Sequence, residues 1–228
     1  MSKKKKAIIA MSGGVDSSVA AYLMTKEGYE CIGATMKLYD KPNNSCEQGK
    51  TCGSSDDVAD AEKMAQSFGM PFYVLDFTHE FDQEVIKRFV NTYMEGGTPN
   101  PCIECNRYMK FQKMMQRMYE MDFDYVVTGH YARVEYDEAS GRYLLKKGMD
   151  ESKDQSYVLY NLTQEQLSHT IFPLGKYHKT EIRAIADEMG FVNANKPDSQ
   201  DICFVPDGDY AKFIENYCDK TFPEGDFV

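Results

Sequence analysis

Apolar residues in the first half of the chain follow two alternating patterns. Short apolar runs, typical of strands buried in a parallel sheet, alternate with stretches in which apolar residues recur every three or four positions, as on one face of a helix. The predicted strands are Ala7–Met11, Glu30–Lys37, Phe72–Phe77 and Tyr125–Thr128. The predicted helices are Asp16–Glu27, Asp56–Phe68, residues 81–93 and Arg107–Met121. This alternation predicts an α/β fold, with an open parallel sheet and helices on both faces.

The second half of the chain predicts a hairpin followed by helices. Tyr131–Tyr136 and Arg142–Lys146 read as its two strands, joined by a turn around Gly141. Further helices are predicted near Thr163–Ser168, Thr180–Met189 and Asp209–Tyr217. We expect a catalytic domain over residues 1–206, followed at 207–228 by the start of a second domain.

Composition and charge narrow the class of protein. With 42% hydrophobic residues in 228, the chain has an ordinary globular composition, and it contains no apolar run of membrane-spanning length. The basic N-terminus precedes an apolar run too short for a secretory signal, so we expect a cytoplasmic protein with no membrane partner. A net charge of −10 disfavours a generic nucleic-acid binder. We interpret two basic groups as solvated faces: Lys110, Lys113 and Arg117, and Lys176, Lys179 and Arg183.

The loop after the first predicted strand carries the strongest chemical signal. Ser12-Gly13-Gly14-Val15-Asp16-Ser17 joins that strand to a helix. Adjacent glycines let the backbone turn tightly, and its N–H groups together with the helix N-terminus form an anion site. The motif lacks the Lys-Ser or Lys-Thr of a Walker A loop. It resembles instead the pyrophosphate loop of ATP pyrophosphatases, which cleave ATP between its α and β phosphates.

Two further residues extend this site to the ends of other strands. Ligands of open α/β sheets bind beyond the carboxyl ends of the strands. Met36 ends the second predicted strand and Gly129 follows the fourth. Taken singly, they are typical of a core residue and a turn residue, but with the loop they outline one nucleotide crevice.

The cysteines supply the second signal. Seven cysteines, an odd number, in a chain without a secretory signal predict reduced thiols. The glycines and prolines before Cys102 predict an irregular connection that lasts until a helix begins after Cys105. A thiol beside a helix N-terminus has its thiolate favoured, which makes Cys105 a candidate nucleophile. Cys-x-x-Cys also fits a zinc half-site or a redox pair, although no second such motif supports structural zinc. Cys203 follows a polar run, and its sequence context leaves open a buried or a reactive thiol.

Five motifs in order then identify a family. The pyrophosphate loop is followed by Gly-Gly-Thr-Pro-Asn-Pro-Cys-x-x-Cys-Asn-Arg-x-x-Lys-Phe, Thr-Gly-His-Tyr-Ala, Lys-Asp-Gln-Ser-Tyr and Asp-Ser-Gln-Asp-Ile-Cys-Phe. The series resembles the tRNA-specific 2-thiouridylases of the MnmA/TrmU family over nearly the whole chain. The resemblance implies a fold like that of the adenine nucleotide alpha hydrolases and a tRNA-uridine 2-sulfurtransferase activity. Members use ATP and Mg²⁺ to adenylate C2 of the wobble uridine, U34, and replace its oxygen with sulfur, giving 2-thiouridine, AMP and pyrophosphate.

The resemblance also implies roles for individual residues. Cys105 corresponds to the catalytic cysteine, and Cys203 to the cysteine that carries a persulfide supplied by a cysteine desulfurase or a sulfur-relay protein. The persulfide attacks C2 directly, or Cys105 frees hydrosulfide from it and leaves a Cys105–Cys203 disulfide. The implied ATP contacts are Ala10, Met11, Ser12, Gly13, Gly14, Val15, Asp16, Ser17, Met36 and Gly129. The implied tRNA contacts are Asn100, Pro101 and Cys102 at the target base, and His130, Lys153, Asp154 and Gln155 elsewhere.

This chain departs from the family pattern in two ways. Many relatives carry Asp, a proposed general base, where this chain has Cys102. With Cys105 and Cys203, that thiol could instead hold three corners of a [4Fe–4S] cluster, leaving one iron open for sulfur. Relatives also continue into a further β-rich region, whereas this sequence stops at Val228, so we expect weak tRNA binding by this polypeptide alone.

Two other functions compete with tRNA thiolation. Another ATP pyrophosphatase with a different acceptor would not need the paired cysteines. A metal or redox module with a vestigial nucleotide site would not consume ATP. Thiolation requires Cys105 and Cys203 to converge in the folded protein near the nucleotide site.

Overall fold

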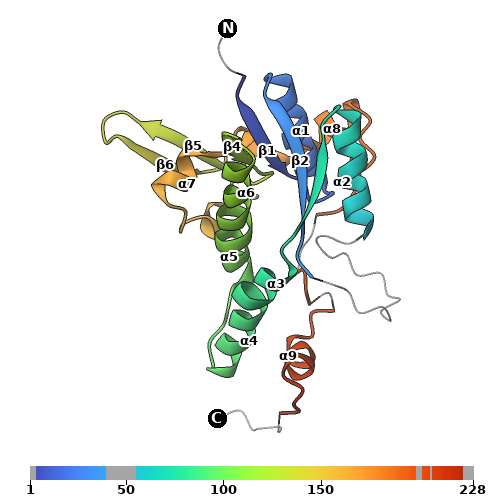
Figure 1. Ribbon diagram of the computed structural model, residues 1–228, viewed down its shortest axis with the longest axis vertical. Helices are drawn as coiled ribbons and strands as arrows, with labels where there is room; N and C mark the ends of the chain where they lie inside the picture. The colour runs from blue at the N-terminus through green and yellow to red at the C-terminus, as the bar shows by residue number, and fades with distance from the viewer. Residues whose placement is uncertain (1–3, 40–54, 199–201, 206, 223–228) are drawn as a thin grey trace.

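The computed structural model describes residues 4–39, 55–198, 202–205 and 207–222. A five-stranded sheet forms its centre, with strand order β3-β2-β1-β4-β7 and every neighbouring pair parallel (Figure 1). The strands are β1 (Lys6–Ala10), β2 (Glu30–Lys37), β3 (Phe72–Asp76), β4 (Tyr125–Val127) and β7 (Thr170–Ile171). The predicted α/β fold with an open parallel sheet is confirmed.

Helices cover both faces of this sheet. They comprise α1 (Val15–Lys26), α2 (Ser55–Ser67), α3 (Thr78–Phe81), η1 (Asp82–Ile86), α4 (Lys87–Met94), α5 (Pro101–Glu104), η2 (Cys105–Lys113), α6 (Met114–Glu120), α7 (Gln164–Ser168), α8 (Lys179–Glu188) and α9 (Tyr210–Cys218), with short 3₁₀ turns at η3 (Ser156–Val158) and η4 (Pro173–Lys176). The predicted hairpin forms a separate two-stranded sheet of β5 (Ala132–Asp137) and β6 (Arg142–Lys147).

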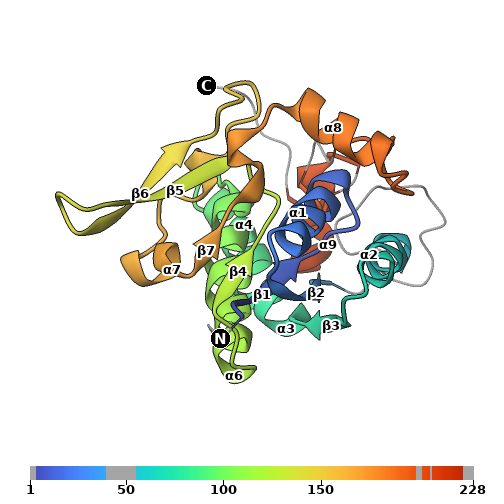
Figure 2. The same ribbon diagram turned by 90° about the horizontal axis from the view of Figure 1, so that it is seen from above.

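Alternation along β1 divides the core into two layers. Ala7 and Ile9 pack with α1, α2 and α8, whereas Ile8 packs with η2 and α6 on the opposite face. Figure 2 shows α1 and α8 on the same side of the sheet. Successive strand residues point to opposite faces, so a run that is apolar throughout supplies both layers.

A third hydrophobic cluster lies beyond the carboxyl ends of β2 and β3. It begins with Leu38 and Phe77, which directly follow those strands, and continues through α3, η1, α4 and α9. Phe204 packs within it against Phe81 and Phe89, with ring centroids 5.8 and 5.2 Å apart. Figure 1 shows α4, α5 and α9 on the side of the sheet where the strands end. We call the third hydrophobic cluster the aromatic cluster.

The observed elements differ from the predicted ones at two places, and one predicted boundary is not tested. β7 has only two residues and was not predicted, because so short a run carries no periodic signal. The prediction that the helix begins after Cys105 is wrong, since it begins at Pro101. The boundary at residue 206 stays a prediction, although Ile214 of α9 packs in the aromatic cluster with residues of α3 and α4.

Within the described part of the chain, no helix is both long and apolar enough to cross a membrane.

Candidate nucleotide and thiol site

The loop between β1 and α1 has a geometry that only glycine permits at one position. Gly13 has φ +75°, and a Cβ placed there would lie 2.3 Å from the carbonyl oxygen of Asp57 on α2. Gly14 precedes the first turn of α1 in an extended conformation, with φ −88° and ψ 162°. Asp57 therefore approaches the loop backbone more closely than any side chain at position 13 would allow.

Hydroxyl groups fix the inside of this loop. Ser17 and Ser18 donate through Oγ to the carbonyl oxygen of Gly14 at 3.0 and 3.2 Å. The backbone N–H of Ser12 donates to Ser17 Oγ at 3.2 Å, while Thr35 Oγ1 donates to the Met11 carbonyl oxygen at 2.6 Å. These hydrogen bonds fix the conformation of the loop. The N-terminus of α1 directly after it is the kind of position that binds an anion.

A segment distant in sequence braces the loop from outside. Asn193 Nδ2 and Lys196 Nζ donate to the Gly13 carbonyl oxygen at 3.0 and 3.3 Å. Lys196 also pairs with Asp57 and Asp60 of α2 at 2.7 and 2.8 Å. Partial burial opposes the charge on Lys196, but these two carboxylates hold its pKa above the ordinary lysine value. Asn193 and Lys196, ten and seven positions before Cys203, therefore connect this part of the chain to the loop.

Asp16 links the start of α1 to two other elements. It accepts hydrogen bonds from the Tyr131 hydroxyl at 2.7 Å and from Lys179 Nζ at 2.8 and 2.7 Å. Burial, followed by the Asp16 charge, raises the pKa of Tyr131 above its ordinary value. A Cβ on Gly129 would lie 2.9 Å from both the Asp16 carbonyl carbon and the Ser17 nitrogen. Gly129 is thus required by the close approach of its backbone to α1, and its predicted contact with ATP remains a prediction.

Lys179 does not belong to a solvated face, so that interpretation of its basic group is wrong for this residue. Its side chain is only 12% exposed and pairs with Asp198 at 2.8 Å as well as with Asp16. Lys176, three residues earlier, is 59% exposed and fits the interpretation. The difference arises because Lys179 lies at the N-terminus of α8, which packs beside α1.

The segment that carries Cys102 and Cys105 is the start of a long helix. Asn100 caps it by accepting a hydrogen bond from the Cys102 backbone N–H at 3.1 Å, and Pro101 occupies its first position. Proline suits that position, since the N–H it lacks would have no partner within the helix. Cys102 is exposed and Cys105, one turn farther along, is half-buried.

Cys105 and Cys203 both reach the aromatic cluster. Each packs against its buried core, and the Tyr39 hydroxyl donates to the Cys203 carbonyl oxygen at 2.9 Å. Met36, at the end of β2, packs against this cluster and against the core layer beneath the sheet. The two thiols therefore pack against the same group of side chains near the carboxyl ends of the strands. Their convergence at the nucleotide site stays a prediction.

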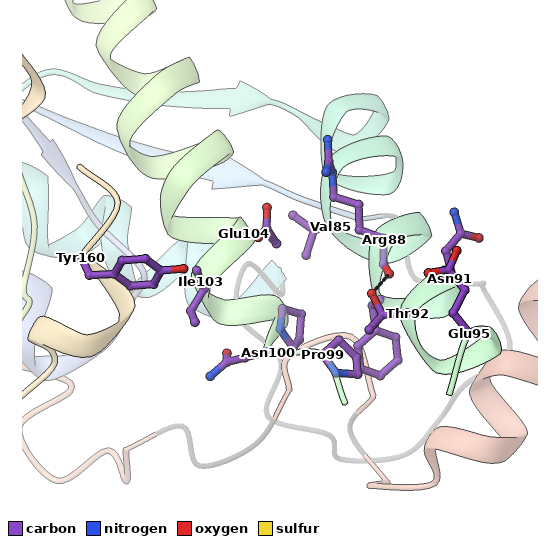
Figure 3. Close-up of a pocket in the computed structure, with 12 residues that line it drawn as sticks. Val85, Arg88, Asn91, Thr92, Glu95, Pro99, Asn100, Ile103, Glu104 and Tyr160 are labelled. Atoms are coloured by element: carbon purple, nitrogen blue, oxygen red, sulfur yellow. Dashed lines mark hydrogen bonds between the residues drawn. The ribbon is translucent and has the colours of Figure 1, made fainter. Parts of the chain in front are cut away.

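A pocket of about 310 Å³ opens between α4 and the cap of α5. Figure 3 shows Asn100, Ile103 and Glu104 on one side, Arg88 and Thr92 of α4 on another. Tyr160, which is 69% exposed, completes one edge. Among the described residues, none hydrogen-bonds to the buried Oε2 of Glu104. Two of the three residues predicted to face the target base, Asn100 and Pro101, line this pocket, whereas Cys102 does not.

The other predicted tRNA contacts have internal partners. His130 is buried, its Nδ1 lies 2.6 Å from Thr128 Oγ1, and burial together with Lys110 lowers its pKa well below the ordinary value. Asp154 accepts hydrogen bonds from the Gly148 and Ser156 backbones, and Gln155 Oε1 accepts one from the Tyr131 backbone. Lys153 pairs with Asp198 at 3.1 Å. Their contact with tRNA remains a prediction.

Two further cysteines, Cys31 and Cys218, lie within the described part of the chain. Cys31 is buried in the core, and desolvation raises its pKa to about 11. Cys218 packs beside the aromatic cluster. Cys46 and Cys52 lie outside the described residues, as do Ser199, Gln200 and Asp201 of the motif before Cys203. No group of three His, Cys, Asp or Glu side chains in the described part of the chain, which includes Cys102, Cys105 and Cys203, could hold a metal ion.

Comparison with known proteins settles the family. Residues 5–207 match the family described as the tRNA methyl transferase HUP domain. The chain belongs to this family. It is 52% identical over 228 residues to the tRNA-specific 2-thiouridylase MnmA of Clostridioides difficile, covering 100% of this chain and 63% of that relative. The resemblance to the 2-thiouridylases is confirmed, and the chain spans 63% of the length of this curated relative.

Solved structures confirm the type of fold. A 4-thiouridine synthetase–RNA complex with bound ATP is similar with a TM-score of 0.58 and 22% identity, over 89% of this chain and 45% of that one. The U34-tRNA thiolase NcsA from Methanococcus maripaludis, with its [4Fe-4S] cluster, has a TM-score of 0.50 and 18% identity, over 93% of this chain and 66% of that one. At these identities the likeness establishes the fold alone.

Several side chains that build the site were not among the predicted site residues. They are Tyr131, Lys179, Asn193, Lys196 and Asp198. Four of them contact the loop or the start of α1 from distant segments, and Asp198 is linked to it through Lys179. A sequence read along its length does not show such contacts. Only their presence beside motif residues, as with Tyr131 after Gly129-His130, could have pointed to them.

Proposed function

We propose that this protein thiolates tRNA, replacing the C2 oxygen of the wobble uridine with sulfur at the expense of ATP. The observation that carries the proposal is the packing of Cys105 and Cys203 against one cluster at the carboxyl ends of the strands. The proposed anion-binding loop follows the carboxyl end of β1, the strand beside β2, and leads into α1. Membership of the family and 52% identity to a tRNA-specific 2-thiouridylase support the same activity.

The chemistry needs both parts of the site. In the first step, O2 of the uracil attacks the α-phosphorus of ATP, and pyrophosphate leaves. The loop N–H groups and the N-terminus of α1 bind the phosphates and stabilise that leaving group. C2 then carries AMP, a far better leaving group than a carbonyl oxygen. Ala10 to Ser17, with Met36 and Gly129, are the proposed nucleotide contacts.

Sulfur then reaches C2 by one of two balanced routes. The terminal sulfur of a Cys203 persulfide attacks C2 and expels AMP, after which the Cys105 thiolate attacks the sulfur of Cys203 and releases 2-thiouridine. Alternatively, Cys105 attacks the persulfide first, and the hydrosulfide it frees attacks C2 and expels AMP. Both routes end in a Cys105–Cys203 disulfide. A thiol reductant then supplies two electrons and returns both cysteines to thiols.

The cofactor assignments rest on the donor groups. Mg²⁺ binds one or two carboxylates together with phosphate oxygens, and Asp16 at the loop fits that role. When bound with ATP, Mg²⁺ would neutralise charge on the phosphates. A [4Fe–4S] cluster on Cys102, Cys105 and Cys203 is the alternative cofactor. Anaerobic purification with iron analysis tests it, and a colourless, iron-free and active protein excludes the cluster.

The proposed partners are a tRNA and a protein sulfur donor of the cysteine desulfurase or sulfur-relay type, acting in the cytoplasm. A gel shift with a tRNA transcript tests the tRNA partner.

The decisive experiment incubates the protein with a tRNA transcript, ATP, Mg²⁺, a thiol reductant, and a cysteine desulfurase with cysteine, which delivers sulfur at the persulfide level. Mass spectrometry of the digested tRNA measures 2-thiouridine, and a coupled assay measures tRNA-dependent pyrophosphate release. We expect both products from the unaltered chain. ATP cleavage without sulfur incorporation, retained when Cys105 or Cys203 is replaced by Ser, would instead indicate an ATP pyrophosphatase with another acceptor. Metal binding without ATP cleavage would indicate a metal or redox module.

A further inference from the structure

Three cationic side chains converge on a single carboxylate beside the loop. Asp198 lies 2.8 Å from Lys179, 3.0 Å from Arg183 and 3.1 Å from Lys153. Partial burial alone would raise the pKa of Asp198, but Lys179 and Lys153 hold it below the ordinary aspartate value. One carboxylate thus satisfies cations from two separate segments of the chain.

This group lies next to the proposed phosphate site. Lys179 Nζ contacts Asp16 in the first turn of α1 as well as Asp198. Its backbone N–H donates to Asp150 at 2.9 Å, which fixes the start of α8. The Lys179 ammonium also lies 5.7 Å from the centre of the Tyr131 ring, and Tyr131 itself donates to Asp16. The ammonium group is therefore positioned from several directions at the N-terminus of α1.

Three cations of this group lie beside the N-terminus of α1. Lys153, Lys179 and Arg183 supply three positive charges, and Asp16, Asp150 and Asp198 supply three negative ones. The N-terminus of α1 adds a further partial positive charge. Asp198 is the only one of these carboxylates that contacts all three cations among the described ion pairs.

We propose that Lys179, supported by Arg183 and Lys153, is a phosphate-binding residue facing the loop, and that Asp198 competes with phosphate for these cations. The inference rests on the proposed function, in which the loop binds ATP and releases pyrophosphate. As the bond between the α and β phosphates breaks, negative charge develops on the leaving pyrophosphate, and a fixed ammonium group stabilises that charge. The competing carboxylate would then weaken the hold on the product and favour its release.

The two halves of this proposal predict opposite effects on one measurement. Calorimetry with inorganic pyrophosphate and Mg²⁺ gives the dissociation constant for each variant of the full chain. Lys179→Met is expected to weaken binding about tenfold or more, the loss of a charge-assisted contact. Asp198→Asn, which keeps the size of the side chain, is expected to tighten binding about threefold to tenfold by removing the competing charge. Lys176→Met, on the same stretch but 59% exposed, is the matched control and should leave binding unchanged.

Protein folding is checked separately from binding. Removing Lys179 takes the ammonium group away from Asp16, whereas Asp198 keeps Arg183 and Lys153. Lys179→Arg preserves the charge if the methionine variant fails to fold. The arginine variant is expected to bind pyrophosphate within about threefold of the unaltered chain. Asp198→Asn retains all three cations and tests the competition independently of Lys179.

The outcomes distinguish this inference from the function on which it rests. If the unaltered chain binds neither ATP nor pyrophosphate, the proposed function fails. If it binds both, and folded Lys179→Met binds pyrophosphate as tightly as the Lys176→Met control, the role of Lys179 is refuted. If Asp198→Asn weakens pyrophosphate binding, Asp198 assists the phosphates, for example through Mg²⁺, and the proposed competition is wrong.

Discussion

The nucleotide loop and the thiol region are built in different ways. The loop is short and local, and its hydroxyl and carbonyl groups bond to one another within residues 12–18. In the thiol region, Cys105 and residues 202–205 pack against the aromatic cluster, in which Phe204 contacts Phe81 and Phe89, and the Tyr39 hydroxyl donates to the Cys203 carbonyl oxygen. Hydrogen bonds require particular atoms at particular places, whereas ring packing tolerates small shifts in position.

This difference fits the chemistry proposed for each region. Phosphate binding needs N–H groups fixed in advance of the reaction. Sulfur transfer needs a thiol to approach first a donor, then C2, then a second thiol. The predictions below test whether the two regions are as independent as their construction suggests.

Loss of either thiol should give the largest effect, and only in sulfur transfer. Cys203→Ser and Cys105→Ser are each expected to lower the rate of 2-thiouridine formation about a thousandfold or more, because both routes use both sulfurs. Pyrophosphate binding should remain within about twofold, since neither thiol belongs to the loop. Cys218→Ser, beside the same cluster, is the control. Equal loss of pyrophosphate binding would show that the regions are not independent.

The aromatic cluster should carry much of the stability of the thiol region. Phe89 is 1% exposed, and its ring lies 5.0 Å from Tyr93 and 5.2 Å from Phe204. Phe89→Ala is expected to lower the free energy of unfolding by about 4 kcal/mol through the cavity it leaves. Urea denaturation measures the change, and Tyr157→Ala, at 61% exposure, should alter stability by no more than about 0.5 kcal/mol. A loss below about 1 kcal/mol would mean that the cluster rearranges to fill the space.

An added methyl group should destabilise the protein more at the crowded Gly13 of the loop than at the open Gly28. Gly13→Ala forces a Cβ to within 2.3 Å of the Asp57 carbonyl oxygen at a positive φ. The expected loss is about 3 kcal/mol, the sum of overpacking and backbone strain. Gly28→Ala has a similar φ of +86° and meets nothing within 4 Å, so it isolates the strain alone at about 1 kcal/mol. Equal losses in the two variants would show that α2 yields to the methyl group.

A smaller effect should appear in the dependence of stability on pH. Burial and Lys110 lower the pKa of His130 in the folded protein, so the unfolded chain binds the proton more readily. This contribution is complete above about pH 6.5 and is lost as the pH falls below it, with a slope of up to about 1.4 kcal/mol per pH unit. Urea denaturation between pH 5 and 8 measures the slope. His130→Asn should flatten it, whereas the exposed His79→Asn should not, and identical slopes would contradict the assignment.

The sequence predicted what is local and missed what depends on convergence. The loop, its glycines and the strands β1 to β4 could be predicted because each is specified by neighbouring residues. We expected the helix that begins at Pro101 to begin later, because we interpreted the proline as part of the preceding loop. Proline in fact suits the first position of a helix. The position of Lys179 could not be found, since a lysine on a helix shows no sign of which neighbour buries it. Asn193 and Lys196 were missed for the same reason.

The proximity of the two thiols is the central claim, and mild oxidation of the folded chain tests it most directly. Copper–phenanthroline treatment without reductant, followed by digestion and mass spectrometry, identifies each disulfide formed. The account predicts that a Cys105–Cys203 link forms rapidly and exceeds any link to Cys31, which is buried in another part of the core. Failure to form that link under conditions that join other cysteines of the folded protein would contradict it.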